Sequence, residues 1–282
     1  MTAIAVSGLP APGAAAVLAR ARRENFPVAL VLLSRAQRAH LMALYGFARL
    51  ADDVGDETQG DRLALLDELA VDLGRVFADA EPLHPVVQRL APTVRALRLP
   101  EAPFRRLIEA NRRDQRVSRY ATWAELREYC AFSANPVGRL VLHVFGAATP
   151  ERFPASDAVC TALQLVEHCQ DVAEDLARGR LYLPAEDLAR FGCQESDLRV
   201  PPASPRVRAL LRFQVARARA LLDSGAPLVR TLSGRARLAI AGFIAGGRAA
   251  ADAIERRGFD VLSGAPRPRR RDLLRGLVTA LR

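Results

Sequence analysis

The chain has 282 residues, of which 50% are hydrophobic, and its formal net charge at pH 7 is +10. This length can bury one large core, and nothing in the composition requires a division into two domains. All 41 basic residues are arginine, which excludes a lysine Schiff base and a lysine-dependent phosphate loop. The positive charge comes without a zinc finger, an RNP-like aromatic pattern or a basic recognition helix, so we expect no nucleic-acid partner.

Helical periodicity dominates the chain. Apolar residues recur at helical spacing in most windows, alanine and leucine are abundant, and strand-like alternation is scarce. We therefore predict an all-α, single-domain fold. Clusters of proline and glycine predict the connections, at residues 7–14, 81–85, 98–103, 146–156, 199–205 and 263–271.

The first cluster of acidic residues lies in LYGFARLADDVGDE, residues 44–57. If residues 36–56 form a helix, one face carries Tyr45, Arg49, Asp52 or Asp53, and Asp56. Carboxylates four residues apart on a helix repel each other, so a positive charge should compensate them. Arg49 supplies one charge, and Mg²⁺ would supply more, because it takes oxygen ligands from one or two carboxylates, water and substrate phosphates. A solvated acidic helix end is the alternative.

The segment SANPVG, residues 133–138, is predicted to lie within a helix with Pro136 at its centre. Proline inside a helix removes one backbone hydrogen bond, so we expect a kink there. Ala134 and Gly138 would allow close approach of a neighbour or a ligand. The kink either shapes a pocket or serves packing alone.

A second acidic cluster lies in QLVEHCQDVAEDLARGRLYLP, residues 164–184. Asp171 and Asp175 are again four residues apart, and Gln164 and Glu167 lie upstream on nearly the same helical face. Two acid-bearing helices that face each other across a cavity could hold Mg²⁺ ions bridged by a diphosphate, with arginines on its remaining oxygens. The repetition favours this interpretation over two unrelated surface patches. His168 either lines this pocket or is an ordinary core or surface histidine.

The sequence contains no pattern typical of a disulfide framework, a zinc site or a membrane-spanning segment. Four cysteines without CxxC spacing and four histidines without HExxH predict reduced thiols and no zinc site. The N-terminus lacks the pattern of a signal peptide, and no segment reaches about 18 uninterrupted apolar residues. We therefore expect a cytoplasmic protein without a membrane-spanning helix.

The C-terminal segment, residues 266–282, combines basic and apolar residues. Four arginines precede apolar side chains that share one helical face, namely Leu273, Leu274, Leu277, Val278 and Leu281. An amphipathic helix of this kind can lie on an anionic membrane surface, where salt would weaken its binding. Docking onto the protein body, or a frayed tail, is the alternative.

These motifs resemble the squalene/phytoene synthase family. FPVALVLLSRAQRAHLMALYGFARLADDVGDE is similar to its first aspartate-rich region, and QLVEHCQDVAEDLARGRLYLPAEDLARFG to its second. The similarity spans residues 22–262. ENFP and YCAFSANPVGRLVL are most similar to the bacterial members that form hydroxysqualene in hopanoid biosynthesis. The resemblance implies an isoprenoid-synthase helical bundle with a central active-site cavity, bound Mg²⁺ and a prenyl diphosphate substrate.

The resemblance also assigns roles to individual residues. It implies that the metal ligands are Asp52, Asp53, Asp56, Asp171 and Asp175. Glu167 departs from the pattern, because many relatives have asparagine there, and this carboxylate is either an additional ligand or changes the number and affinity of the bound metal ions. It implies that Arg49 contacts the diphosphate, that Tyr129 lies near the leaving group, and that Arg180 belongs to a flap after the second motif. Tyr45, Gln164 and Phe26 are further candidates for substrate binding. Phe26, Phe47 and Phe132 either line an isoprenoid channel or pack the core, and the core interpretation is favoured for each.

The expected activity is Mg²⁺-dependent conversion of presqualene diphosphate and water to hydroxysqualene and diphosphate. The alternatives are head-to-head prenyl transfer that gives presqualene diphosphate, squalene or phytoene, and a non-catalytic isoprenoid-binding or assembly protein. We expect a flexible segment at residues 1–20, a catalytic domain at 21–264 and a basic amphipathic tail at 265–282. Peripheral contact with the inner face of the cell membrane, and channelling with other squalene-pathway enzymes, are the expected associations.

Overall fold

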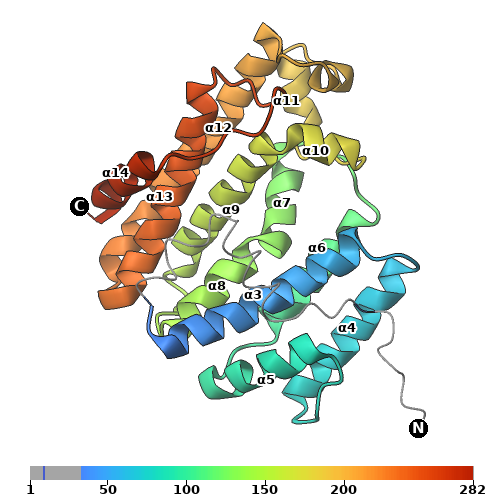
Figure 1. The fold of residues 1–282 in the computed structure, drawn as a ribbon, viewed down its shortest axis with the longest axis vertical. Coiled ribbons are helices and arrows are strands. Elements are labelled where there is room, and N and C mark those ends of the chain that lie inside the picture. Colours follow the sequence, from blue (N-terminus) through green and yellow to red (C-terminus); the bar gives the residue numbers. More distant parts are fainter. Residues whose placement is uncertain (1–8, 10–32, 282) are drawn as a thin grey trace. The chain divides into compact units, whose positions relative to one another are not determined.

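The computed structural model describes Leu9 and residues 33–281, and within these residues it contains helices and no named strand (Figure 1). The all-α prediction is confirmed. None of the described helices is long and apolar enough to cross a membrane. Most of the connection predicted at residues 7–14, the flexible segment predicted at residues 1–20, and Phe26 lie outside the described residues.

The described chain divides into two compact units. The first unit contains the described residues up to Arg116 together with residues 139–148, and the second contains residues 117–138 and 149–281. The boundary passes through α8 (Asn135–Val144). The four cysteines are free thiols, as the absence of CxxC spacing predicted.

The first unit is built around α3 (Arg35–Asp56), the helix of the first acidic cluster. Ser34 begins it with a capping box, in which its side chain accepts a hydrogen bond from the Gln37 amide at 3.2 Å. Within this unit α3 packs against α4 (Arg62–Phe77), α5 (Pro85–Leu97) and α6 (Ala102–Asp114). Phe47 is fully buried and meets Phe104 edge to face at 5.3 Å, which confirms the core interpretation of Phe47.

The second unit contains α7 (Trp123–Ser133) and the elements that follow α8. These are α9 (Phe153–Gln170), α10 (Val172–Ala177), α11 (Ala185–Arg190), η1 (Glu195–Arg199), α12 (Pro205–Gly225), η2 (Ala226–Thr231), α13 (Gly234–Arg256) and α14 (Arg270–Leu281). Helix α12 packs along α9, and α13 contacts α9, α12 and α14. Small residues make this close packing possible. At Gly247, a Cβ atom would lie 2.6 Å from Cδ2 of Leu163 and 3.3 Å from Leu222.

The predicted kink at Pro136 is wrong. Helix α7 ends at Ser133, Ala134 caps it, and α8 starts at Asn135, so Pro136 lies in a first helical turn. Proline is tolerated there, because the first amide groups of a helix have no partner within the helix. The predicted close approach at Gly138 is confirmed, since a Cβ atom there would lie 2.4 Å from Sγ of Cys160.

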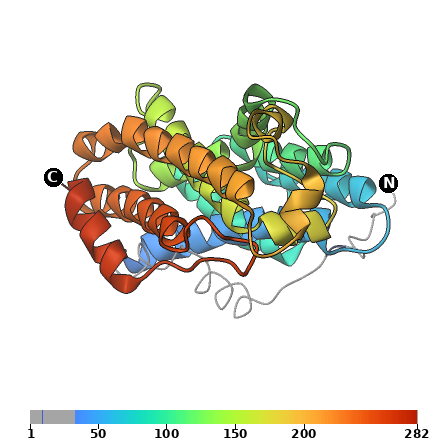
Figure 2. The same ribbon diagram turned by 90° about the horizontal axis from the view of Figure 1, so that it is seen from above.

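The C-terminal helix α14 lies along α13 (Figures 1 and 2). Arg256 forms an ion pair of 2.8 Å with Asp272, and Arg237 donates a hydrogen bond of 2.7 Å to the carbonyl of Leu281. A Cβ atom at Gly276 would lie 3.1 Å from Cα of Ala245. The structure therefore agrees with one of the alternatives for the tail, in which the helix docks onto the protein body. Leu274 and Val278 point away from this contact and are 66% and 53% exposed.

Candidate functional site

The first acidic cluster divides its carboxylates between two environments on α3. Asp53 is buried and pairs with Arg49, whose Nε lies 2.7 Å from Oδ1 of Asp53. Arg49 also reaches Glu57, with 3.1 Å between Nη2 and Oε1. Arg49 thus compensates Asp53 and Glu57, in agreement with the expectation that this arginine offsets the acidic cluster. Asp52 is exposed and Asp56 is partly exposed, so these two carboxylates remain accessible.

Asp52 is held by a residue of α6. Nδ2 of Asn111 donates a hydrogen bond of 3.1 Å to Oδ1 of Asp52, and a second one of 3.1 Å to the carbonyl of Leu107. Burial among protein atoms raises the pKa of Asp52 to about 6, and the hydrogen bond from Asn111 and the charge of Arg49 oppose this rise. Asp52 is thus accessible from solvent, yet the protein atoms around its carboxylate make the negative charge unfavourable. A bound cation would offset this cost.

Gly55 makes room for this contact. A Cβ atom at Gly55 would lie 2.4 Å from Oδ1 of Asn111, so a larger residue would displace the amide that orients Asp52. Sequence reasoning missed Asn111. The available signal was an asparagine in the same helix as the apolar residues Leu107 and Ile108, because a buried amide needs polar partners.

The second acidic cluster lies at a break between two helices. Helix α9 ends at Gln170, and α10 starts at Val172. Asp171 sits between them with φ −103° and ψ 13°. Gln164 and Glu167 therefore belong to a different helix from Asp175, although the Asp175 amide still donates to the Asp171 carbonyl at 2.8 Å and preserves the helical spacing.

Both carboxylates of this cluster are desolvated. Burial, followed by the charge of Asp171, raises the pKa of Asp175 to about 7, while the charges of Arg178 and Arg180 lower it. Burial, followed by the charge of Glu174, raises the pKa of Asp171. Two carboxylates in this environment repel each other, and a divalent cation would relieve both the repulsion and the desolvation.

An aromatic cluster lies beside Asp175. His168 is buried and stacks on Tyr182 with 3.9 Å between ring centroids, while Tyr182 stacks on Tyr129 at 5.5 Å. Tyr120 joins the cluster at 5.4 Å from Tyr129. Nδ1 of His168 lies 3.9 Å from Oδ2 of Asp175, and burial lowers the pKa of His168 to about 3, which keeps the ring neutral. The structure therefore brings Tyr129 to the second acidic cluster, in the same unit.

The remaining candidates lie on α3, α7 and α9 and in the turn after α10. Tyr45 is partly buried on α3, and Gln164 and Glu167 lie on α9, the first partly buried and the second exposed. Arg180 is partly buried, and its amide donates to the Asp175 carbonyl at 2.8 Å. Phe132 is partly buried.

No group of three or more histidine, cysteine, aspartate or glutamate side chains in the described part of the chain is arranged as a complete metal site. Two accessible carboxylates in each cluster nevertheless match the way Mg²⁺ binds, with water and substrate phosphates completing its shell. The donor set therefore fits Mg²⁺. It does not fit Zn²⁺, which prefers nitrogen and sulfur ligands.

Comparisons with known proteins identify the family of the chain. The model of the squalene/phytoene synthase family matches residues 19–273. A hydroxysqualene synthase from Zymomonas mobilis is 37% identical over 203 residues, which cover 71% of this chain and 67% of the relative. A phytoene synthase from Arthrospira platensis is 34% identical over 211 residues, with 70% and 68% covered. The crystal structure of squalene synthase HpnC from Alicyclobacillus acidocaldarius is 42% identical, with a TM-score of 0.79 and 91% and 99% covered.

Proposed function

Because the chain belongs to the squalene/phytoene synthase family and is an enzyme of that family, we propose that it converts presqualene diphosphate and water into hydroxysqualene and diphosphate. The observation that carries the proposal is that both acidic clusters, with Asp52 and Asp56 in the first and Asp171 and Asp175 in the second, lie in the region that matches the family and keep these four carboxylates at least partly exposed. The choice of product is supported by the similarity to hydroxysqualene synthases.

The carboxylates are proposed to hold Mg²⁺ for this reaction. Asp52 and Asp56 would contribute from the first cluster, Asp171 and Asp175 from the second, and Glu167 would be an additional ligand. When bound, Mg²⁺ supplies positive charge that stabilises the departing diphosphate. Arg49 fixes Asp53 through their ion pair, which leaves the neighbouring carboxylates accessible.

The remaining groups act on the substrate. The carbon–oxygen bond to the diphosphate breaks, and its electron pair leaves with the diphosphate. Arg180, adjacent to the second cluster, would bind the departing oxygens, as arginine does with phosphates. The carbocation is captured by one water, which then loses a proton, so the step balances without a reductant. Tyr129 would line the apolar side of this site.

The experiment is incubation with presqualene diphosphate, and separately with farnesyl diphosphate, in the presence of Mg²⁺ and without NADPH. Mass spectrometry of the products should find hydroxysqualene from presqualene diphosphate. In ¹⁸O-labelled water the alcohol should carry the label. An unlabelled alcohol or a hydrocarbon product would contradict capture of water.

Head-to-head prenyl transfer is the second candidate function. The 34% identity to a phytoene synthase favours it. The same incubation separates the two candidates, because a prenyl-transfer enzyme would consume farnesyl diphosphate and give presqualene diphosphate, squalene or phytoene.

We also propose that the enzyme works in the cytoplasm at the inner face of the cell membrane, since its substrate and product are lipids. The exposed side chains of Leu274 and Val278, on a helix with several arginines, support this contact. Hopanoid biosynthesis, and channelling with other enzymes of the squalene pathway, stay predictions.

A further inference from the structure

Two connections of the second unit pair with each other next to the second acidic cluster. Residues 118–122 precede α7, and residues 178–184 join α10 to α11, which begins with Ala185 and Glu186. The Leu181 amide donates to the Ser118 carbonyl at 2.9 Å, and the Ala185 and Glu186 amides donate to the carbonyls of Tyr120 and Ala121 at 2.9 and 3.0 Å. The paired backbones form one isolated parallel bridge, between Arg119 and Leu181.

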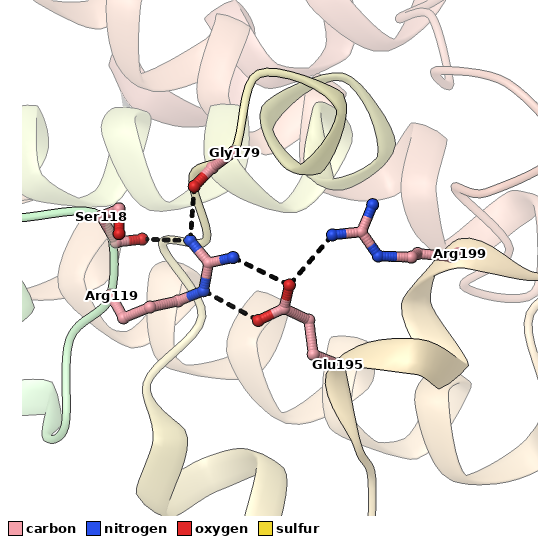
Figure 3. A network of polar contacts seen from close by, with 5 residues as sticks. All are labelled: Ser118, Arg119, Gly179, Glu195 and Arg199. Carbon is pink, nitrogen blue, oxygen red and sulfur yellow. Dashed lines mark hydrogen bonds and ion pairs between the residues drawn. The ribbon is translucent and has the colours of Figure 1, made fainter.

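The side chain of Arg119 closes this pairing at one end (Figure 3). Its Nε and Nη2 atoms each donate to one oxygen of the Glu195 carboxylate at 2.8 Å. Its Nη1 atom donates to the carbonyls of Ser118 at 2.7 Å and Gly179 at 2.6 Å. Arg199 binds the same Glu195 carboxylate at 3.0 Å. We call the set of Arg119, Glu195 and the Gly179 carbonyl the Arg119 clamp.

The clamp holds the turn that follows the second acidic cluster. Gly179 has φ +81°, a conformation that favours glycine, and a Cβ atom there would meet nothing within 4 Å. Glycine is therefore needed for the turn and not for space. The next residue is Arg180, whose amide donates to the Asp175 carbonyl at 2.8 Å. Arg119 thus fixes a carbonyl one residue from Arg180, in a turn that is bonded to Asp175.

Stability alone gives little reason for this arrangement. The side chains of Arg119 and Glu195 are 38% and 36% exposed, and ion pairs at such positions contribute little to the free energy of unfolding. The geometry is nevertheless specific, because the fork of the guanidinium binds a carboxylate with two parallel hydrogen bonds and still donates to two carbonyls.

We propose that Arg119 is a positioning residue for diphosphate binding, which holds the Gly179 turn so that Arg180 and Asp175 keep a fixed relation. This inference rests on the proposed function insofar as it names diphosphate as the ligand of Arg180. The contact by which Arg119 restrains the Gly179 turn exists in the substrate-free protein, so it can be measured separately.

The test uses Arg119→Ala and Arg119→Lys, with Arg219→Ala as a matched control. Arg219 also bridges two carboxylates, at 2.7 Å from Asp252 and 2.5 Å from Glu255, with 34% exposure in the same unit, but it belongs to α12. Hydrogen–deuterium exchange of the substrate-free proteins should be at least about threefold faster at the Leu181, Ala185 and Glu186 amides in Arg119→Ala. It should be unchanged there in Arg219→Ala.

Kinetics provide the second readout. Arg119→Ala should raise the KM measured by diphosphate release about tenfold, with a smaller loss of kcat, and Arg119→Lys should lie between this variant and the wild type because lysine cannot form the fork. Glu195→Ala should have a similar effect, and the double variant should be no worse than either single variant. Unchanged exchange in Arg119→Ala, a KM within twofold of the wild type, or additive effects would overturn the proposal. Failure of the wild type to release diphosphate would instead reject the proposed function, while the exchange measurement still decides whether the clamp exists.

Discussion

Asn111 donates a hydrogen bond of 3.1 Å to Asp52, and this contact fixes a carboxylate of α3 by a side chain of α6. Residues that orient a metal ligand commonly change metal affinity by about 10- to 100-fold when they are replaced. We therefore predict that Asn111→Ala raises the Mg²⁺ concentration needed for half-maximal diphosphate release by about tenfold.

The matched control for this prediction is Gln115→Ala. Gln115 lies just beyond α6, and its side-chain amide donates to two backbone carbonyls, those of Gly55 at 3.0 Å and Asn111 at 3.1 Å. Gly55→Ala should reproduce the effect of Asn111→Ala, because the added Cβ atom would meet Oδ1 of Asn111 at 2.4 Å. Equal Mg²⁺ requirements in Asn111→Ala and Gln115→Ala would contradict the positioning role.

Loss of single carboxylates should abolish most of the turnover without unfolding the protein. We expect each of Asp52→Asn, Asp56→Asn, Asp171→Asn and Asp175→Asn to lower kcat by about 100-fold or more, because each removes charge that would hold Mg²⁺. Circular dichroism should be unchanged. Asp223→Asn, which alters an exposed ion pair with Arg248, is the control and should keep its activity. Normal Mg²⁺-dependent turnover in both Asp52→Asn and Asp171→Asn would reject the two-cluster site.

The pKa of Asp175 is raised from its ordinary value of 3.8 to about 7 by burial and the charge of Asp171, which predicts a dependence of stability on pH. Between these two values the folded protein binds more protons than the unfolded chain, so this group makes the metal-free protein more stable as pH falls from about 7 towards 4. At pH 8 the buried charge is destabilising. Asp175→Asn should therefore raise the Tm of the metal-free protein at pH 8 by about 3 °C, while it lowers activity.

The pH series makes this prediction specific. At pH 5 the carboxyl group of Asp175 is already protonated, so the gain in Tm from Asp175→Asn should shrink towards zero. Differential scanning fluorimetry at pH 5 and pH 8, with and without Mg²⁺, measures both effects. A Tm at pH 8 that is lower in Asp175→Asn than in the wild type would mean that the charge is not destabilising.

The exposed apolar pair on α14 predicts how the protein meets a membrane. Since α14 is docked on α13, its removal would uncover that helix, and substitution of Leu274 and Val278 is the cleaner test. The double variant Leu274→Asp with Val278→Asp should bind vesicles of anionic lipid about tenfold more weakly. Binding of the wild type should weaken as salt rises.

Thr279→Asp is the control for charge on α14, because Thr279 is exposed on the same helix and is not apolar. It should bind vesicles more strongly than the double variant does. Sedimentation with vesicles measures all three proteins, and equal binding by the wild type and the double variant would remove this surface from the proposal.

The fold class was predictable from local sequence, because helical periodicity and clusters of proline and glycine act within a few residues. The helix of the first acidic cluster was predicted within one residue of its start, at Arg35, and to its end at Asp56. Pro136 was misplaced because proline is compatible both with a kink and with a first helical turn. Local sequence does not decide between these two positions for proline. The end of α7 at Ala134 decides it, because a new helix then starts just before Pro136.

Only those residues of the candidate site that belong to a short motif were predictable from the sequence. Asp52, Asp56, Asp171 and Asp175 follow from two short motifs. Their partners do not, because Asn111 meets Asp52 across 59 positions of the chain and Arg119 meets Glu195 across 76. Contacts at such separations depend on how helices pack, which a single sequence does not encode in any local pattern.

The composition of α13 has a consequence for how this enzyme tolerates change in evolution. Its buried positions are largely alanine and glycine, among them Ala241, Ala245, Gly247 and Ala249, and it packs against α9, α12 and α14. These positions have little volume to lose, and a larger side chain would meet a neighbouring helix, as the close approach of Leu163 to Gly247 shows. Drift at these alanine and glycine positions is therefore restricted to exchanges among the smallest residues, whereas exposed arginines elsewhere can vary.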